Sequence, residues 1–546
     1  MNRRGLSVVA LVAIGIGVAA AVAVGSGGAP PVEGSPAPSG PATAPATPSA
    51  SLAPPSAEPT PEALAWGPTL AEYDAALAEA AALGLDEVIG QVIIAPVSDR
   101  DPDAAVRLMR RYHLAGVMVE TGAIGSERQT RALTAAVQGA EERPWPAMVA
   151  VDEEGGTVAR LKALLPDMPA FMAAGAVDDA EVTGAAFASH GAAMRELGFT
   201  VTFAPSADVT IGPADPIIRT RSASSDPDRA GRAVVAAVDG LSSGGVVAVP
   251  KHYPGHGSIR TDSHDVVSVQ RRTLKQMERT DLVPFAAAAD AGAPAIMVGH
   301  IVVPEWGKRP ATVNPQAYQY LRDQLGFDGV IITDSMSMRG VTSLFEAGRP
   351  AAEALIAGAD IVLMPANTGM AVNHIKEALA SGDLTRERLN EAAARSILLA
   401  RWGDSLDPAA GLPAPGYARE YSAQATVVAA RDCDALLGSS VTIKGGTKGQ
   451  RAWLAESLRA GGVTVSAKGG ATTVALVVRD RAAAKADVVV ALAGPWGLES
   501  STARAYVAVW GGGPEQMRAL GRVLTGDADA AGTWPVDVDV PYAPCA

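Results

Sequence analysis

Basic runs, histidine and cysteine are all scarce in this 546-residue chain. No run of lysine or arginine appears after the first few residues, and the formal net charge is −13. A nucleic-acid partner would need a lysine- and arginine-rich face to neutralise its phosphates. We therefore expect no nucleic-acid partner. Acidity itself indicates little about the substrate, because it mainly keeps a protein soluble.

The chain has only two cysteines, Cys433 and Cys545, both in its last quarter. In an exported protein such a pair is expected to form a disulfide. Closing a loop of this length would contribute ~4–5 kcal/mol through chain entropy, less any strain. The alternative is a pair of free thiols, one of them on a frayed tail.

Residues 1–25 have the layout of an export signal or a membrane anchor. Arg3 and Arg4 precede an apolar run over 6–24, and no acidic residue appears before Glu33. Small residues suited to cleavage lie around 21–23, at the end of the run. The run is also close to the ~20 residues that span a bilayer, so a retained membrane tether is the alternative to cleavage. No cysteine near the run offers an acceptor for lipoprotein processing. Either way we expect an extracytoplasmic protein, secreted or anchored.

Residues 26–61 are almost entirely Ala, Pro, Ser, Gly and Thr, a composition that predicts a disordered linker. The chain is too long for one ordinary domain. A second Pro- and Gly-containing stretch over 406–420 marks another boundary. We expect a catalytic domain over 62–405 and a smaller C-terminal α/β domain over 421–546.

Eight apolar, β-rich runs alternate with alanine-rich helical stretches in the larger domain. The runs cover residues 88–97, 114–120, 147–154, 199–209, 244–253, 295–303, 329–337 and 358–366. Continuous apolar strands separated by helices predict a parallel sheet covered on both faces. Eight such units fit a closed (β/α)8 barrel, and a doubly wound open sheet is the alternative. The overall prediction is a TIM-type barrel followed by a smaller α/β sandwich domain.

Polar side chains follow the strands of this predicted barrel. They are Asp152, Asp208, Lys251, His252, His300 and Asp334. In an eight-fold barrel the carboxyl ends of the strands converge on one face, where the active site is built. A single polar residue there is usually a cap or a turn residue, but six at equivalent places indicate a site.

The loop KHYPGHGSIRTDSHD, residues 251–265, holds three of the seven histidines. His252 and His256 have the i, i+4 spacing of a helical zinc site, but Pro254 and the neighbouring glycines would break a helix. The other interpretation pairs Asp262 with His264, a carboxylate that orients an imidazole for proton transfer. The alternative is an ordinary Asx turn with a solvated histidine.

Two further carboxylates are candidates for chemistry at strand ends. Asp334 in GVIITDSMSM could act as a nucleophile, or simply cap the next helix. Asp152 in VDEEGGTVAR precedes Gly155 and Gly156, which allow close approach of a ligand to the backbone. The alternative is that Asp152 belongs to an ordinary acidic turn without a binding role.

These motifs carry a family resemblance. VDEEGGTVAR, FAPSADV, RTRSASSDP, KHYPGHGSIRTDSH, IMVGHIVVP and GVIITDSMSM, in that order, resemble glycoside hydrolase family 3 and its β-N-acetylhexosaminidase branch. The resemblance covers about residues 80–405, and the tail resembles the second α/β domain of two-domain members. It implies that Asp334 is the nucleophile and that His264, oriented by Asp262, is the general acid/base. It also implies a set of sugar-binding residues, Asp152, Arg160, Arg221, Lys251 and His252, supported by Asp208, His256 and His300.

The chain departs from the family pattern at three positions. Glu153 stands where the family usually has glutamine, Thr157 where arginine is common, and Ala223 where an aromatic residue is usual. We expect Glu153 to place an extra carboxylate near the mouth of the pocket. The exchange at Ala223 puts the packing around Arg221 in doubt.

The resemblance implies an exo-acting, retaining β-N-acetylglucosaminidase that cleaves peptidoglycan fragments or related amino-sugar glycans. We expect a monomer that needs no cofactor or metal. The alternatives are a β-glucosidase or an N-acetylglucosaminide phosphorylase of the same family, a metal-dependent hydrolase, and a non-catalytic wall-binding protein. A histidine acid/base becomes neutral after giving up its proton, so it would not repel a phosphate acceptor as a carboxylate would.

Overall fold

The computed structural model describes residues 62–262 and 267–545. The predicted export signal or anchor, the linker over 26–61 and His264 lie outside the described residues. Within the described ranges, no helix is both long enough and apolar enough to cross a bilayer.

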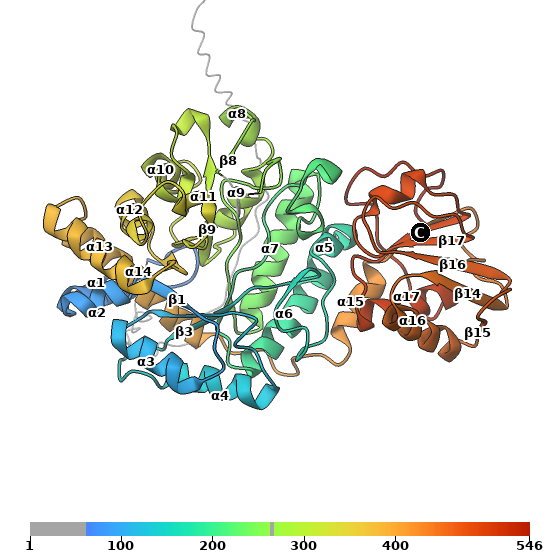
Figure 1. Ribbon diagram of the computed structural model, residues 1–546, viewed down its shortest axis with the longest axis horizontal. Coiled ribbons are helices and arrows are strands. Elements are labelled where there is room, and N and C mark those ends of the chain that lie inside the picture. The colour runs from blue at the N-terminus through green and yellow to red at the C-terminus, as the bar shows by residue number, and fades with distance from the viewer. Residues whose placement is uncertain (1–61, 263–266, 546) are drawn as a thin grey trace, which may run out of the picture. The chain divides into compact units, whose positions relative to one another are not determined.

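The larger part of the chain is built on parallel strands (Figure 1). Each of the eight predicted runs contains at least one strand that pairs in parallel with a strand of another run, so these predictions are confirmed. The strands are β1 (Ile93–Val97), β2 (Gly116–Val119), β3 (Met148–Val151), β6 (Val201–Thr202), β7 (Val247–Ala248), β9 (Ala295–Val298), β11 (Val330–Thr333) and β12 (Val362–Leu363). Six of them form a sheet in the order β12-β1-β2-β3-β6-β7, and β9 pairs with β11. Every pairing among these strands is parallel.

Isolated parallel bridges link the two sheets at both edges. After β7, Tyr253 pairs with Val298 of β9, and Ile332 of β11 pairs with Ile361 ahead of β12. The Tyr253 amide donates to Met297 O at 2.9 Å. The result is a mixed α/β fold with a parallel half-barrel sheet.

Helices follow most of the strands and cover their outer side. They are α1 (Leu70–Ala82), α2 (Leu85–Gly90), α3 (Pro102–Tyr112), α4 (Glu127–Gln138), α5 (Met172–Val177), α6 (Ala180–Glu196), α7 (Pro227–Ser243), α8 (Leu274–Met277), α9 (Val283–Asp290), α10 (Pro315–Asp323), α11 (Arg339–Thr342), α12 (Arg349–Ala357), α13 (Thr368–Ser381) and α14 (Arg386–Ser405). Capping residues stabilise the first turn of many of these helices. At α7, Asp226 accepts a hydrogen bond from the Arg229 amide at 2.8 Å, and Pro227 occupies the first turn.

Glycine allows helices α6 and α7 to pack closely. A Cβ added at Gly240 of α7 would lie 2.5 Å from the Gly184 carbonyl oxygen of α6, so no larger residue fits. This close packing sets the two helices against the strands β6 and β7 that carry part of the site.

A second sheet follows the linker, in the order β13-β18-β17-β16-β14-β15. Its elements are α15 (Tyr417–Gln424), β13 (Val427–Ala430), β14 (Ser440–Gly445), α16 (Lys448–Ala460), β15 (Thr464–Val465), β16 (Thr472–Val477), β17 (Val488–Ala491), β18 (Ala505–Ala508) and α17 (Pro514–Thr525). β13 is antiparallel to β18 and the other pairings are parallel. Side chains of α16 and α17 share an apolar cluster with one face of this sheet.

The predicted disulfide is present between Cys433 and Cys545, 112 residues apart. It lies beside β13, where the Cys545 amide donates to Val428 O at 2.7 Å. The bond therefore ties the end of the chain to the first strand of the C-terminal sheet.

The C-terminal sheet contacts a loop that leads out of the candidate site. Asp167 Oδ1 accepts from the Glu515 amide at the start of α17, at 3.2 Å. The Ala170 amide donates to Trp510 O, just after β18, at 2.8 Å. Both contacts hold the segment between β5 (Val158–Ala159) and α5.

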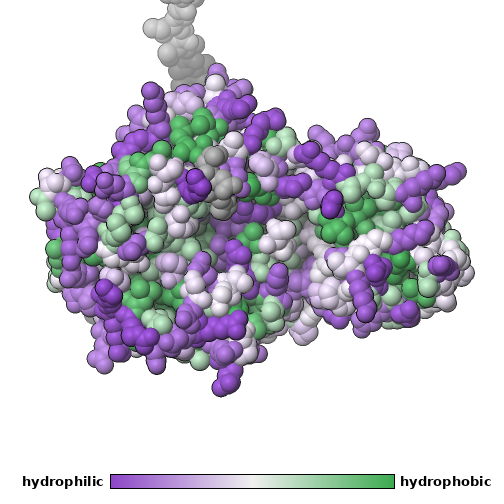
Figure 2. All heavy atoms as spheres, viewed as in Figure 1, coloured by the Kyte–Doolittle hydropathy of each residue, from purple (hydrophilic) through white to green (hydrophobic). Residues whose placement is uncertain are grey.

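Figure 2 shows hydrophilic side chains spread over most of the visible face, with hydrophobic ones in separate small areas. The large hydrophobic residues that are exposed lie on different elements and loops: Leu70, Leu85, Val269, Leu344, Met370 and Val478. Single exposed apolar residues of this kind are normal on a folded protein.

Candidate active site

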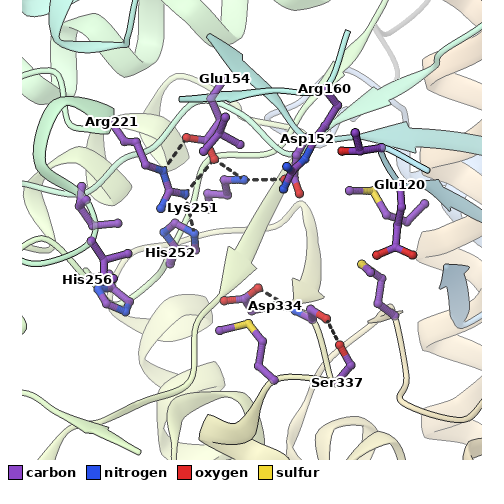
Figure 3. Close-up of a pocket in the computed structure, with 18 of the residues that line it drawn as sticks. Glu120, Asp152, Glu154, Arg160, Arg221, Lys251, His252, His256, Asp334 and Ser337 are labelled. Carbon is purple, nitrogen blue, oxygen red and sulfur yellow. Dashed lines mark hydrogen bonds and ion pairs between the residues drawn. The ribbon is translucent and has the colours of Figure 1, made fainter. Parts of the chain in front are cut away.

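A cavity of ≈ 520 Å³ opens at the carboxyl ends of the parallel strands (Figure 3). Seven residues singled out from the sequence line it: Asp152, Arg160, Arg221, Lys251, His252, His256 and Asp334. Asp152 follows β3 and Asp334 follows β11, while Lys251 and His252 come shortly after β7. A volume of this size is ordinary for a small-molecule site.

The hairpin of β4 (Glu153–Gly155) and β5 carries Glu154, a carboxylate that pairs with two cations of the cavity. Glu154 accepts two hydrogen bonds from Arg221, from Nε and Nη2, both at 2.8 Å. Lys251 Nζ lies 2.7 Å from Glu154 and 2.8 Å from Asp152. Burial opposes ionisation of Glu154, but Arg221 and Lys251 hold the pKa of its carboxyl far below the usual range.

The side chains of Lys251 and Arg221 remain charged in this setting. Burial alone would lower the pKa of Lys251, yet Asp152 and Glu154 raise it above its ordinary value. Only 4% of the Lys251 side chain is exposed, so its charge depends on these two carboxylates. The network thus fixes two cations beside the cavity.

His252 is held from behind by Asp208, which is fully buried. His252 Nδ1 lies 2.7 Å from Asp208 Oδ2, and this contact leaves Nε2 facing Arg221 at 3.4 Å. Asp208 also accepts from the His256 amide at 2.6 Å, so it organises the loop as well as the ring. Burial opposes its ionisation, but His252 lowers the pKa of Asp208 below the ordinary value.

Asp334 is half-buried and lies at the floor of the cavity. Its amide donates to Val298 O at 2.8 Å, and its Oδ1 accepts from the Ser335 amide at 2.7 Å. Burial opposes ionisation of Asp334, but His300 and His252 bring its pKa below the ordinary value. An ionised carboxylate at this place can act as a nucleophile.

His300 supports the Asp334 loop rather than lining the cavity. Its Nε2 donates to Ser335 O at 2.9 Å, and its Nδ1 lies 2.7 Å from the Thr312 hydroxyl. Since a carbonyl oxygen only accepts, Nε2 carries the proton in the bond to Ser335.

The loop after Lys251 contains no helix over residues 251–262, as predicted. The i, i+4 spacing of His252 and His256 therefore does not place them on one helical face. Within the described residues, no group of three or more His, Cys, Asp or Glu side chains is arranged to hold a metal ion. Asp262 is not among the residues that line the cavity, and its partner His264 lies outside the described residues, so the role of this pair stays a prediction.

The structure corrects the expectation for Glu153. Its carboxylate is not near the mouth of the pocket but is buried, with 2% exposed, on the opposite side of the hairpin from Glu154. It accepts from the Leu161 amide at 2.7 Å and lies 3.5 Å from His190 Nε2. Successive residues of a strand point to opposite faces, which separates the two carboxylates. The alternation of VDEEGG could have indicated this.

Two residues that line the cavity, Glu154 and Glu120, were not predicted from the sequence. Glu154 follows the predicted Asp152 by two residues, so strand alternation would have placed both on the same face. Glu120 follows β2 directly and lines the cavity. Its position after a predicted barrel strand was the available signal. The small side chain of Ala223 had put the packing around Arg221 in doubt. In the structure Glu154 accepts two hydrogen bonds from the Arg221 guanidinium and so fixes its position.

Comparisons with known proteins identify the family of the chain. The model of the glycosyl hydrolase family 3 N terminal domain matches residues 84–399. The chain is 34% identical over 258 residues to a beta-hexosaminidase of Stenotrophomonas maltophilia, covering 46% of this chain and 76% of that protein. It is 32% identical over 321 residues to beta-hexosaminidase LpqI of Mycobacterium tuberculosis, covering 56% and 80%. It is also 31% identical to beta-hexosaminidase A of Pseudoalteromonas piscicida, spanning 54% of each chain.

Solved structures show the same fold. A family 3 beta-N-acetylglucosaminidase from Paenibacillus superposes with a TM-score of 0.73 at 24% identity, covering 84% of this chain and 99% of that one. The structure of M. tuberculosis LpqI gives 0.55 at 30% identity, covering 60% and 96%. The family model spans more than half of the sequence and includes every residue placed in the cavity. The chain belongs to glycosyl hydrolase family 3.

Proposed function

We propose that this protein is a retaining exo-β-N-acetylglucosaminidase that removes terminal N-acetylglucosamine from peptidoglycan fragments or related glycans. Relatives named beta-hexosaminidases support the sugar, at 31–34% identity. The observation that carries the proposal is the place of Asp334, which follows β11 and lines one cavity together with Asp152, Arg221 and Lys251.

The reaction proceeds in two steps. Asp334 attacks the anomeric carbon while His264 gives a proton to the leaving oxygen, so the glycosidic bond breaks and a glycosyl ester forms. Water then attacks the same carbon, His264 takes its proton, and the ester bond to Asp334 breaks. Asp262 keeps the imidazole in the required tautomer and stabilises its charged form.

The sugar is held by the charged network beside Asp334. Carboxylate oxygens of Asp152 accept from sugar hydroxyls, and the guanidinium and ammonium groups of Arg160, Arg221 and Lys251 donate to sugar oxygens. His252 completes the binding set. Because Lys251 and Arg221 are fixed before the sugar arrives, little ordering is needed on binding.

We further propose that the six-stranded sheet and the β9–β11 pair together form one closed (β/α)8 barrel over residues 62–405. The C-terminal part predicted over 421–546 forms a smaller α/β sandwich domain, but the linker predicted over 406–420 ends earlier than expected, since α15 begins at Tyr417. The predicted signal or anchor and the Cys433–Cys545 disulfide support a location in an oxidising compartment outside the cytoplasm.

Turnover of nitrophenyl glycosides tests the proposal. The purified protein is expected to release nitrophenol from the β-N-acetylglucosaminide much faster than from the β-glucoside. Products are then identified with and without saturating phosphate. Free N-acetylglucosamine supports the hydrolase and the sugar 1-phosphate would make the protein a phosphorylase. Equal or faster glucoside cleavage would overturn the assigned sugar, and no turnover of either would point to a binding protein.

A further inference from the structure

Glu120 is a carboxylate of the cavity that has no part in the mechanism above. It comes directly after β2, and its amide donates to Val97 O, the last residue of β1, at 2.9 Å. The parallel register of β1 and β2 therefore places Ser98 and Glu120 side by side at the carboxyl ends of the two strands. Both line the same cavity as Asp152 and Asp334.

The Glu120 carboxylate is oriented by its neighbour. The Ser98 hydroxyl donates to Oε2, an interaction that directs the side chain and leaves Oε1 available as an acceptor. Figure 3 shows Glu120 on the far side of Asp152 and Arg160 from Arg221 and His256, with its carboxylate turned toward the cavity.

Glu120 differs from Asp152 and Glu154, the two carboxylates of the cavity that pair with cations. Lys251 pairs with both Asp152 and Glu154, and Arg221 pairs with Glu154. No ion pair within the described residues includes Glu120, which is half-buried. Once a glycan fills the cavity and displaces water, a carboxylate oxygen needs a donor, because leaving it without one is costly.

We propose that Glu120 is a substrate-binding residue that accepts a hydrogen bond from a hydroxyl or ammonium group of the bound glycan. The inference rests on the proposed function, since it assumes that an amino-sugar glycan occupies this cavity. The negative charge of Glu120 disfavours an anionic group at the same place. The wall opposite Arg221 thereby becomes a second selective surface of the pocket.

Steady-state kinetics of two variants test the inference. Glu120→Ala removes the acceptor and Glu120→Gln keeps a neutral one. Each is assayed with nitrophenyl N-acetylglucosaminide, with the β-1,4 disaccharide of N-acetylglucosamine, and with the same disaccharide carrying a free amine on its second sugar. Glu127→Ala is the matched control, since Glu127 is exposed on α4 and pairs with Arg131.

We expect Glu120→Ala to raise KM roughly ten- to hundredfold for at least one substrate, with kcat within about threefold of the parent. A rise for all three substrates places the contact on the terminal sugar, and a rise for the disaccharides alone places it on the next sugar. If Glu120→Gln raises KM only for the disaccharide with the free amine, the donor is an ammonium group. If it recovers most of the affinity for all substrates, the donor is a hydroxyl.

The inference is overturned if Glu120→Ala and Glu127→Ala both keep KM within twofold for every substrate. It is also overturned if the loss in Glu120→Ala falls on kcat alone. Failure of the proposed function is a separate result, because the unmodified protein would then show no turnover of any N-acetylglucosaminide.

Discussion

Glu154 and Arg221 form a bidentate ion pair beside the cavity, with both hydrogen bonds at 2.8 Å. The Glu154 side chain is 2% exposed, and Lys251 approaches the same carboxylate. Isolated charges at such depth would be expensive, so each of the three depends on the others. The hairpin that carries Glu154 therefore positions two of the cations assigned to sugar binding.

Glu154→Gln is expected to damage both stability and sugar binding. Removing one charge of a buried group leaves Arg221 and Lys251 poorly compensated, which costs about 3–5 kcal/mol of unfolding free energy. KM for the nitrophenyl N-acetylglucosaminide should rise along with that loss. Urea unfolding and steady-state kinetics check the two effects, and an unchanged KM in a folded variant would contradict the binding role of this network.

Glu153 is expected to tolerate glutamine but not leucine. Glutamine still accepts from the Leu161 amide, whereas leucine leaves that buried donor without a partner, at a cost of about 1–3 kcal/mol. Urea unfolding of Glu153→Gln and Glu153→Leu compares the two. Equal losses would show that the hydrogen bond to Leu161 contributes nothing measurable.

Stability should fall as the pH is lowered from about 6.5 to about 4. His256 is almost fully buried, and burial lowers its pKa to about 4. In the unfolded chain a histidine binds its proton near pH 6.5, so only the unfolded state gains a proton across this window. A difference of that size corresponds to about 3 kcal/mol lost between the two pH values.

Urea unfolding at several pH values measures this dependence. His256→Gln, which does not titrate, should give a flatter profile over the same window. Identical profiles for the parent and His256→Gln would contradict the buried, neutral state of this histidine.

Reducing the Cys433–Cys545 disulfide is expected to lower the unfolding free energy by about 4–5 kcal/mol, from the entropy of the loop it closes. The double variant Cys433→Ser/Cys545→Ser should match the reduced protein and should not respond to reductant. Thermal unfolding with and without dithiothreitol measures the effect. A parent that is insensitive to reductant would contradict the bond.

Much of the fold could be predicted because its signal is local. Each predicted parallel strand lies in a continuous apolar run, such as VIIT before Asp334, and this pattern follows from burial on both faces. Asp152, Lys251 and Asp334 could be assigned to one site because parallel strands bring their carboxyl ends together. The pattern of polar residues after apolar runs thus predicted four of the side chains that line the cavity, Asp152, Lys251, His252 and Asp334.

The features that could not be predicted depend on contacts between residues that are far apart in the sequence. Strand alternation separates the adjacent Glu153 and Glu154, but no local pattern shows which partner each one meets. Glu153 lies beside His190 and Glu154 pairs with Arg221, and both partners are distant in sequence. The antiparallel β13 depends on its pairing with β18, almost eighty residues later. The contact of Asp167 with α17 likewise joins segments that no local pattern connects.

The covalent step at Asp334 is the central claim, and trapping tests it most directly. The protein is incubated with a fluorinated amino-sugar donor that slows hydrolysis of the glycosyl ester, and the labelled peptide is identified by mass spectrometry. We predict a single adduct on the peptide containing Asp334, and no adduct with Asp334→Ala. An adduct on another carboxylate, such as Asp152 or Glu120, or an unlabelled protein that still turns over the donor, would contradict the account.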